Sequence, residues 1–209
     1  EPTEGNRNWT WYDEKLSLVS STGVKMIATI ANPPDWAAVN PDGTGAIGTD
    51  DACSNVIIDN SDYYNFISAL VGRYKSAPYN IHVWEILNEP DAMPGYRCGG
   101  GLVTYGLNGT GYGVLAQGTA QLIKSLDPSS KIIMGGLAYD WFYNEASDGK
   151  FNRYFIDDFA AEGNGVNSID AWNFHFFKDF APEWERWTIG NLPTCGPVSD
   201  GIGPTYFTY

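Results

Sequence analysis

The stretch WEILNEPD, residues 84–91, ends a hydrophobic run on an amide, a carboxylate and a proline. The amide of Asn88 both donates and accepts hydrogen bonds, and the carboxyl group of Glu89 can give or take a proton. Pro90 has no backbone N–H, so a regular strand stops here and the two polar side chains stand at its end. The alternatives are a turn-stabilising asparagine and a solvent-exposed loop glutamate, but the abrupt change from apolar to polar favours a site for chemistry.

Polar or aromatic side chains also follow three other apolar runs. The run VKMIATIA (24–31) leads into NPPDW, and the run KIIMGGLA (131–138) leads into YDW. The run SIDAWNFHFF (168–177) carries His175 between aromatic residues near its end. Carboxylates, indoles and an imidazole therefore gather where predicted strands end, and we expect His175 to be a site residue rather than a core histidine.

Helical patterns separate the predicted strands, which also include residues 81–88. A helix ending at Gly23 precedes the first strand, a helix from Ser61 precedes 81–88, and a helix after the glycine-rich loop GTGYG (109–113) precedes residues 131–138. Each strand is almost entirely apolar, which is typical of parallel strands covered by helices. The helical faces are Tyr12, Leu16 and Val19; Tyr63, Phe66, Ile67, Leu70, Val71 and Tyr74; Leu115, Thr119, Leu122, Ile123 and Leu126; and, in a helix from Phe151, Tyr154, Phe155 and Phe159.

Strands that alternate with helices leave two architectures, a doubly wound sheet and a (βα)8 barrel. A nucleotide site in a doubly wound sheet needs a phosphate loop, but no strand leads directly into GTGYG and no Lys-Ser/Thr pair follows it. A barrel collects its functional residues at the C-terminal ends of its strands. We therefore expect an α/β chain forming part of a (βα)8 barrel, with residues 1–209 in one domain and a long loop at 178–209.

The composition restricts the class of ligand. The 209 residues carry a formal net charge of −13, which opposes binding to nucleic acid and to anionic membranes. No apolar run is long enough to span a bilayer, so we expect no membrane insertion. Three cysteines and two histidines lack the spacing of a zinc site, and we expect neither a metal nor a cofactor. Eight Trp, thirteen Tyr and ten Phe offer flat rings suited to an amphipathic ligand, although most are expected in the core.

Taken in order, these motifs resemble the clan A retaining glycoside hydrolases, (βα)8 enzymes whose general acid/base is the Glu of an Asn-Glu-Pro after the fourth strand. WEILNEPD resembles that signature, and EPTEGNRNWTWYD (1–13) resembles the segment after the second strand. PPDW resembles the end of the third strand, and NFHFF resembles the end of the sixth. The branch it most resembles includes family 39 and xylosidase-like or cellulase-like enzymes. The resemblance implies a hydrolase for a β-linked oligo- or polysaccharide, represented here from the end of strand two through strand six.

The resemblance also assigns roles to residues. It implies that Glu89 is the general acid/base and that Asn88 hydrogen-bonds the sugar 2-hydroxyl, a contact that tightens in the transition state. Alternation along the strand predicts Glu85, Leu87 and Glu89 on one side, with Glu85 deeper and hydrogen-bonded to an Arg or Lys. Indole rings that are expected either to stack on sugars or to fill the core are those of Trp36, Trp141 and Trp172.

Retaining hydrolysis needs a second carboxylate, ~5 Å from the first, as the nucleophile. The family carries it at the end of the seventh strand, and a whole barrel takes ~250 residues. Glu183 and Glu185, in PEWERW, end no apolar strand and are not candidates. We therefore expect a fragment of the barrel that has no glycosidase activity on its own.

A different interpretation keeps the barrel without catalysis, as a structural or cell-surface protein whose aromatic cleft binds carbohydrate. A glutamate closing the seventh strand would favour hydrolysis, and any other residue there would favour the binding protein. Both interpretations place the protein outside the cell or at its surface, where disulfides persist. Cys53 and Cys98 follow consecutive predicted strands, so we predict a disulfide between them, the alternative being two free thiols, with a partner outside this chain for Cys195. The sequence does not give the sugar or the oligomeric state.

Overall fold

The centre of the molecule is a parallel sheet. The computed structural model describes residues 5–31, 33–34, 37–39, 56–57, 60–92, 105–106, 108–138, 151–152, 154–161 and 165–175. The sheet contains β1 (Ala28–Ile30), β4 (Val83–Ile86) and β5 (Lys131–Met134), in that spatial order. Isolated parallel bridges join residues 133 and 137 of the β5 segment to residues 171 and 174 on its far side. Each new strand is therefore added at the same edge, without a reversal of strand order.

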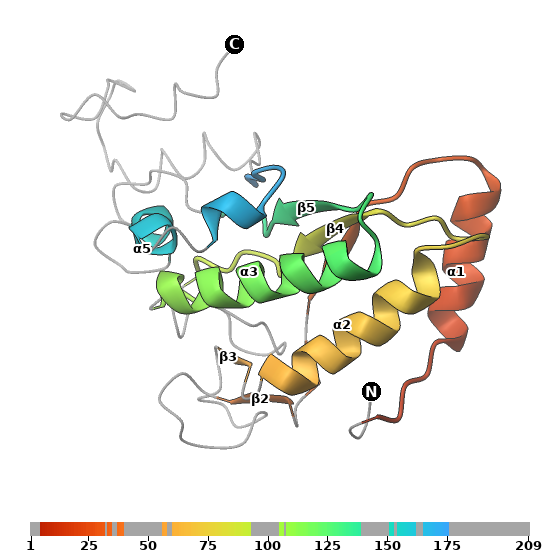
Figure 1. The fold of residues 1–209 in the computed structure, drawn as a ribbon, viewed down its shortest axis with the longest axis horizontal. Helices are drawn as coiled ribbons and strands as arrows, with labels where there is room; N and C mark the ends of the chain where they lie inside the picture. Colours follow the sequence, from red (N-terminus) through yellow and green to blue (C-terminus); the bar gives the residue numbers. More distant parts are fainter. Residues whose placement is uncertain are drawn as a thin grey trace, which may run out of the picture.

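Helices cover this sheet (Figure 1). They are α1 (Thr10–Ser21), α2 (Asn60–Tyr74), α3 (Gly109–Leu126), α5 (Phe155–Ala161) and a short 3-10 helix, η2 (Val166–Ser168). Helix α3 packs against α2 on one side and against α5 on the other. A small antiparallel pair, β2 (Ala38–Val39) and β3 (Val56–Ile57), was not expected from the sequence. Within the described ranges, no helix is both long and apolar enough to cross a membrane.

The register of the sheet separates two faces. Trp84 and Ile86 of β4 align with residues 28 and 30 of β1, and both side chains are fully buried in the core shared with α2 and α3. Glu85 aligns with Thr29 on one side and with Ile133 on the other. Since successive side chains of a strand point to opposite faces, Glu85 and Thr29 lie on the face away from the helices. Trp84 and Ile86 lie on the helix-covered face.

Helix α2 confirms its predicted face. Its buried side chains are those of Tyr63, Ile67, Val71 and Tyr74, and Phe66 and Leu70 are partly buried against the same core. Helix α1 confirms its predicted end, where Gly23 adopts a φ of +75°. The predicted inner face of α1 is mostly exposed, however, because only Leu16 packs against the core.

The glycines of GTGYG (109–113) belong to the first turns of α3 and not to a preceding loop. Asn108 caps the helix, since its Oδ1 accepts a hydrogen bond from the Gly111 N–H at 2.7 Å. Gly109 faces α5 so closely that a Cβ there would lie 2.7 Å from the Cβ of Asp158. These residues therefore start α3 and let it approach α5. This close packing of the two helices explains the glycine-rich motif, and a phosphate-binding role is not needed to explain it.

The predicted strand 168–177 is confirmed in part. Residues 166–168 form η2, and the chain then runs beside β5 through the bridges at Ala171 and Phe174. The Ile132 N–H donates to the carboxylate of Asp170 at 2.9 Å instead of to a strand carbonyl, which interrupts the ladder. The helix predicted from Phe151 begins at Phe155, and Tyr154 is exposed while the rings at 155 and 159 are buried. The predicted loop 178–209 lies outside the described residues.

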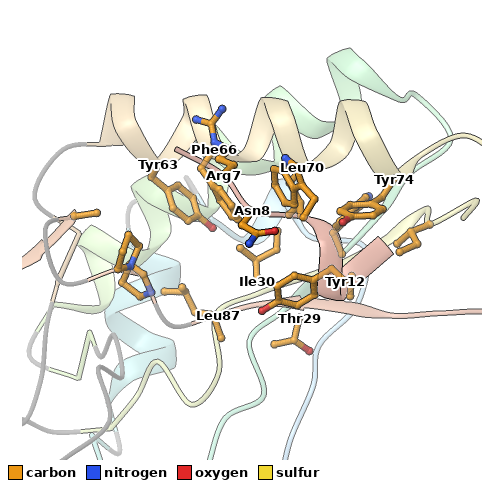
Figure 2. A pocket seen from close by; sticks show the side chains of 18 of the residues that line it. Arg7, Asn8, Tyr12, Thr29, Ile30, Tyr63, Phe66, Leu70, Tyr74 and Leu87 are labelled. Carbon is orange, nitrogen blue, oxygen red and sulfur yellow. The ribbon is translucent and has the colours of Figure 1, made fainter. Parts of the chain in front are cut away.

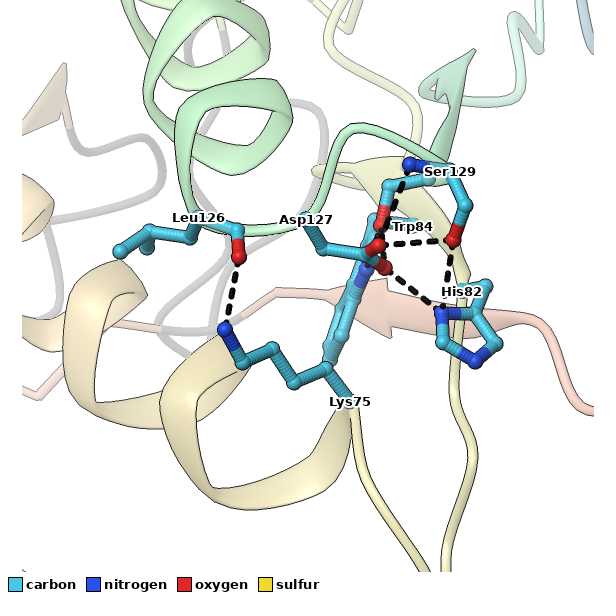
Figure 3. A network of polar contacts seen from close by, with 7 residues as sticks. Lys75, His82, Trp84, Leu126, Asp127 and Ser129 are labelled. Atoms are coloured by element: carbon cyan, nitrogen blue, oxygen red, sulfur yellow. Dashed lines mark hydrogen bonds and ion pairs between the residues drawn. The ribbon is translucent and has the colours of Figure 1, made fainter.

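A polar network joins β4 and β5 at their N-terminal ends (Figure 3). Asp127 lies 2.6 Å from Nδ1 of His82, accepts from Ser130 Oγ at 2.6 Å and accepts from Ser129 Oγ at 2.7 Å. The Trp84 indole donates to Ser130 at 3.2 Å. Burial opposes the charge of Asp127, but hydrogen bonds from His82, Ser130 and Ser129 outweigh it and hold the pKa of this carboxyl well below its usual range. Ser129 and Asp127 approach the same nitrogen of His82, so they do not form a nucleophile relay, which uses both ring nitrogens.

An ion pair between Asp13 and Arg73 links α1 to α2. The Arg73 guanidinium donates to Asp13 through Nε at 2.8 Å and through Nη2, and the Tyr74 hydroxyl donates to the same carboxylate at 3.0 Å. These bonds, led by that from Arg73, lower the pKa of Asp13 to about 2 against the opposing effect of desolvation. The guanidinium also lies 5.8 Å from the centre of the Trp9 ring.

Candidate active site

The backbone leaves the regular strand before it reaches the two polar residues of NEP. Strand β4 ends at Ile86, and Leu87 and Glu89 adopt φ values of +63° and +49°. Such left-handed values are unfavourable for residues with a side chain and persist where surrounding bonds hold them. The Leu87 N–H donates to Ile30 O at 2.9 Å, and the Glu89 N–H donates to Gly136 O at 3.0 Å. The segment is therefore held between β1 and the chain that follows β5.

This change of direction alters which side chains share a face. Glu85 and Glu89 both contact residues from the segments after β5 and around 173–175, as the alternation predicts. Leu87 instead is 2% exposed, belongs to the core, and lines a pocket together with Trp84. The prediction that Leu87 would share the side of the two glutamates is wrong, because a positive φ interrupts the extended backbone on which alternation depends.

Glu89 and His175 meet at the C-terminal end of the sheet, although 86 residues separate them. Nδ1 of His175 lies 3.0 Å from Oε1 of Glu89, and the side chains are 24% and 8% exposed, respectively. Water competes little with a hydrogen bond that is so well shielded, so the imidazole can fix the direction of the carboxyl group. The pair thus offers a carboxyl group that is oriented by a partner and available for proton transfer.

The turn after Glu89 is also buried and bonded. Pro90 O accepts a hydrogen bond from the Tyr105 N–H at 2.7 Å. Asp91, which is 1% exposed, accepts from the Ala138 N–H at 3.1 Å. The prediction that NEP is more than an exposed loop is consistent with this burial, because a solvated loop glutamate would not be 6% exposed as Glu89 is.

Glu85 lies deeper on the same side and is 6% exposed. Its Oε2 accepts from Thr29 Oγ1 at 2.5 Å, and its Oε1 accepts from the Gly136 N–H at 3.0 Å and from Asn173 Nδ2 at 2.6 Å. The expectation of an Arg or Lys donor is wrong, because these three neutral donors supply the hydrogen bonds that a buried carboxylate requires. Asn173 was missed at the level of sequence, although its spacing of two from His175 predicts the same face.

Tyr112 of α3 supports the strand ends from the helix side. Its buried hydroxyl donates to Ile86 O at 2.8 Å and accepts from the Gly135 N–H at 3.0 Å. Burial raises the pKa of this phenol, so it remains a donor. A Cβ at residue 135 would lie 2.5 Å from Ile86 O, so glycine is required for this close approach of the segments that follow β4 and β5.

The remaining predicted site residues have different surroundings. Asn88 is partly buried, and its side chain forms no hydrogen bond with any residue in the described part of the chain. The ring of Trp172 lies edge-on against Phe159 of α5, with centroids 5.8 Å apart, which is the helix side of its segment. Outside the described residues lie Trp36, Trp141, Cys53, Cys98 and Cys195, whose roles and pairing stay predictions.

A pocket of about 430 Å³ lies elsewhere, on the helix-covered face of β1 (Figure 2). Side chains of α2 such as Tyr63 and Phe66 form one wall, and the N-terminal segment around Asn8 forms another. Neither Glu89 nor His175 lines it. We assign the candidate site to the strand ends, where the paired titratable groups lie.

Several solved glycoside hydrolases share the fold of this chain. A β-xylosidase from Caulobacter crescentus CB15 matches with a TM-score of 0.52 and 18% identity, over 81% of this chain and 30% of that enzyme. An endo-β1,6-glucanase matches with a TM-score of 0.59 and 13% identity, over 88% of this chain and 42% of that enzyme. A β-galactosidase from the psychrophilic Marinomonas ef1 matches with a TM-score of 0.53 and 12% identity, over 86% of this chain and 36% of that enzyme.

The TM-scores establish a common fold despite the low identities, and the predicted resemblance to glycoside hydrolases is confirmed at that level. The chain spans less than half the length of each of these enzymes. No protein-family model matches the chain, and no curated protein sequence does.

Proposed function

We propose that this chain is the acid/base-bearing part of a retaining glycoside hydrolase that acts on a β-linked glycan. The observation that carries the proposal is the shielded contact of Glu89 with His175 at the C-terminal end of a parallel sheet. Glycoside cleavage needs one carboxylic acid that protonates the leaving oxygen and then, as a carboxylate, activates water. The fold shared with a β-xylosidase, a β1,6-glucanase and a β-galactosidase supports the same class of substrate.

The proposed setting is part of a (βα)8 barrel. Its support is the order β1, β4, β5 and then residues 171–174, in which spatial and sequence order agree. A doubly wound sheet would instead reverse its strand order at a switch point, and ligands would bind there. In a barrel, the C-terminal ends of all strands form one mouth, and Glu89 and His175 would both face it.

Two neighbours complete the proposed site. Asn88, the residue before the acid/base, would hydrogen-bond the sugar 2-hydroxyl with its amide. His175 would hold the carboxyl group of Glu89 in the orientation for proton transfer. For Trp36 and Trp141 we retain the proposal of stacking on sugar rings, whereas the contact of Trp172 with Phe159 favours a packing role.

The nucleophile must be another carboxylate. Glu85 is unsuited to this role, because its two oxygens already accept three hydrogen bonds in a buried position. We propose that the nucleophile comes from outside these 209 residues, and that the isolated 209-residue chain gives no retaining turnover. Measurable turnover of an aryl β-glycoside by that chain would contradict this part of the proposal.

The substitution Glu89→Gln tests the acid/base role in the intact protein. The amide is nearly isosteric but cannot donate a proton as an acid, so hydrolysis of a substrate with a poor leaving group should fall by ~100-fold to 10,000-fold. An activated aryl glycoside needs little protonation, so its first step should suffer less. Added azide, which attacks without a general base, should restore turnover and give a β-glycosyl azide. Glu14→Gln, on the exposed surface of α1, is the matched control and should change neither rate.

The outcome separates catalysis from carbohydrate binding. If Glu89→Gln hydrolyses both substrates as fast as the unchanged protein, Glu89 is not the acid/base. If the intact protein hydrolyses neither substrate but binds β-linked oligosaccharides, and Asn88→Ala weakens that binding, the non-catalytic alternative replaces the proposal.

A further inference from the structure

Glu85 is the acidic side chain of β4 for which the proposed chemistry has no use. Its three donors, from Thr29, Gly136 and Asn173, belong to three different segments of the chain. A buried carboxylate is stable only while its donors remain in place. This one therefore fixes the positions of β1, of the segment after β5 and of residues 171–175 relative to each other.

Asn173 connects Glu85 with the candidate acid/base. Its side chain donates to Glu85 at 2.6 Å, and its carbonyl accepts from the Leu137 N–H at 3.0 Å. The His175 N–H donates to Leu137 O at 2.8 Å, so Leu137 holds the chain on both sides of the intervening residue. The imidazole of His175, two residues after Asn173, then reaches Glu89 at 3.0 Å.

Gly136 packs directly against the side chains of Asn173 and His175. A Cβ there would lie 2.2 Å from Nε2 of His175 and 3.0 Å from Nδ2 of Asn173, so the two side chains lie directly over it. Its N–H donates to Glu85 and its carbonyl accepts from the Glu89 N–H. A displacement of Asn173 is therefore transmitted to the neighbouring imidazole instead of being absorbed by free space.

We propose that Glu85 and Asn173 are positioning residues that orient His175 toward Glu89. This inference rests on the proposed function in so far as Glu89 is the acid/base, and it adds how the direction of that carboxyl group is set. Neither residue touches the sugar in this role. Glu85 acts through hydrogen bonds to Asn173 and Gly136, and Asn173 acts through the position of the imidazole.

Nitrogen-15 NMR of the histidine rings tests the inference on the full 209-residue chain. The chain has two histidines, so the ring signals form two sets, one from His82 and one from His175. The proton between Nδ1 of His175 and Glu89 should give a downfield resonance in the proton spectrum. A change of this resonance in Glu89→Gln identifies it. Asn173→Ala is expected to abolish this resonance. His82, at the opposite end of the sheet, should keep its signals and so report that the chain is folded.

Three further variants separate positioning from a general loosening of the sheet. Glu85→Gln still accepts from Asn173 and Gly136 and can donate to Thr29, so the resonance should remain. Glu85→Leu removes the acceptor, and the resonance should disappear. Thr29→Val removes a donor on the other side of Glu85 without touching residue 173, and it should leave the resonance in place.

Three results would overturn the inference: no such resonance in the unchanged chain, its retention in Asn173→Ala, or its loss in Thr29→Val to the same degree. If Glu85→Leu does not fold, the contrast between Asn173→Ala and Glu85→Gln decides. These measurements do not require glycosidase activity. If Glu89→Gln slows the substrates with poor and with activated leaving groups equally, the proposed function is contradicted. The NMR result then still tests the positioning roles of Glu85 and Asn173 independently.

Discussion

The two ends of the parallel sheet each carry a histidine–carboxylate pair, and the pairs differ in what surrounds them. At the N-terminal end, Asp127 is also bonded by two serines of its own turn, and its partner His82 is 41% exposed. At the C-terminal end, Glu89 is 8% exposed and its partner His175 is 24% exposed. The Asp127 side chain is itself only 10% exposed, so the two carboxylates are about equally shielded, and the pairs differ in the serines around Asp127 and in the exposure of the histidine. The comparison indicates that the surroundings, and not the pair itself, would distinguish a structural site from the proposed reactive one.

Replacing each histidine with alanine tests this distinction most strongly. In the intact protein, His175→Ala should lower the rate of hydrolysis by ~100-fold, the size of effect that a small misplacement of a catalytic group produces. His82→Ala should leave the rate unchanged and lower the free energy of unfolding. Steady-state kinetics and urea unfolding of both variants measure the two effects, and equal loss of rate in both would remove the proposed difference between the ends.

Asp127→Ala should have the largest effect on stability at the N-terminal end. It removes the common acceptor of His82, Ser129 and Ser130, and we expect the free energy of unfolding to fall by ~1–3 kcal/mol. Glu14→Ala, on the exposed face of α1, is the control and should change it little. A wild-type urea midpoint in Asp127→Ala would show that the network does not contribute to stability.

Tyr112→Phe examines the C-terminal end without touching the proposed catalytic pair. The substitution leaves Ile86 O and the Gly135 N–H without their partner, so stability should fall by ~1–2 kcal/mol. Tyr63→Phe is the matched control, because the buried hydroxyl of Tyr63 has Thr119 as a polar neighbour but forms no hydrogen bond of ordinary geometry among the described residues. Thermal unfolding of the two variants gives the difference, and equal losses would mean that the bridge made by Tyr112 adds nothing.

The smallest effect is expected at the ion pair between Asp13 and Arg73, which lies at neither site. The folded pKa of Asp13, about 2, is below its ordinary value of 3.8. The pair therefore stabilises the fold fully above pH ~4, and this contribution disappears as the pH falls through the folded pKa. Asp13→Asn should remove the pH-dependent part and have less effect at high salt. Urea unfolding at several pH values measures it, and an unchanged pH profile would contradict the assignment.

The sequence predicts the parts of this molecule that local pattern determines. The apolar period of α2 and the apolar runs of β4 and β5 are sufficient to locate those elements, and the position of Glu89 at a strand end follows from them. The neutral donors of Glu85 were not predicted, because they come from segments far away in the sequence. The inward turn of Leu87 was missed for a related reason, since its φ is held by a bond to β1. The two-residue strands β2 and β3 are too short to give a pattern.

The left-handed backbone at Glu89 has a consequence for engineering this protein. Glycine adopts such a φ without strain, while a residue with a side chain pays ~1–3 kcal/mol there. A library selected only for heat resistance would therefore accumulate glycine at position 89 and lose the carboxyl group. Selection for stability favours glycine at this position, whereas selection for turnover favours glutamate. A stabilisation campaign should therefore hold residue 89 constant and diversify exposed positions such as Gly72, where a Cβ meets no other atom.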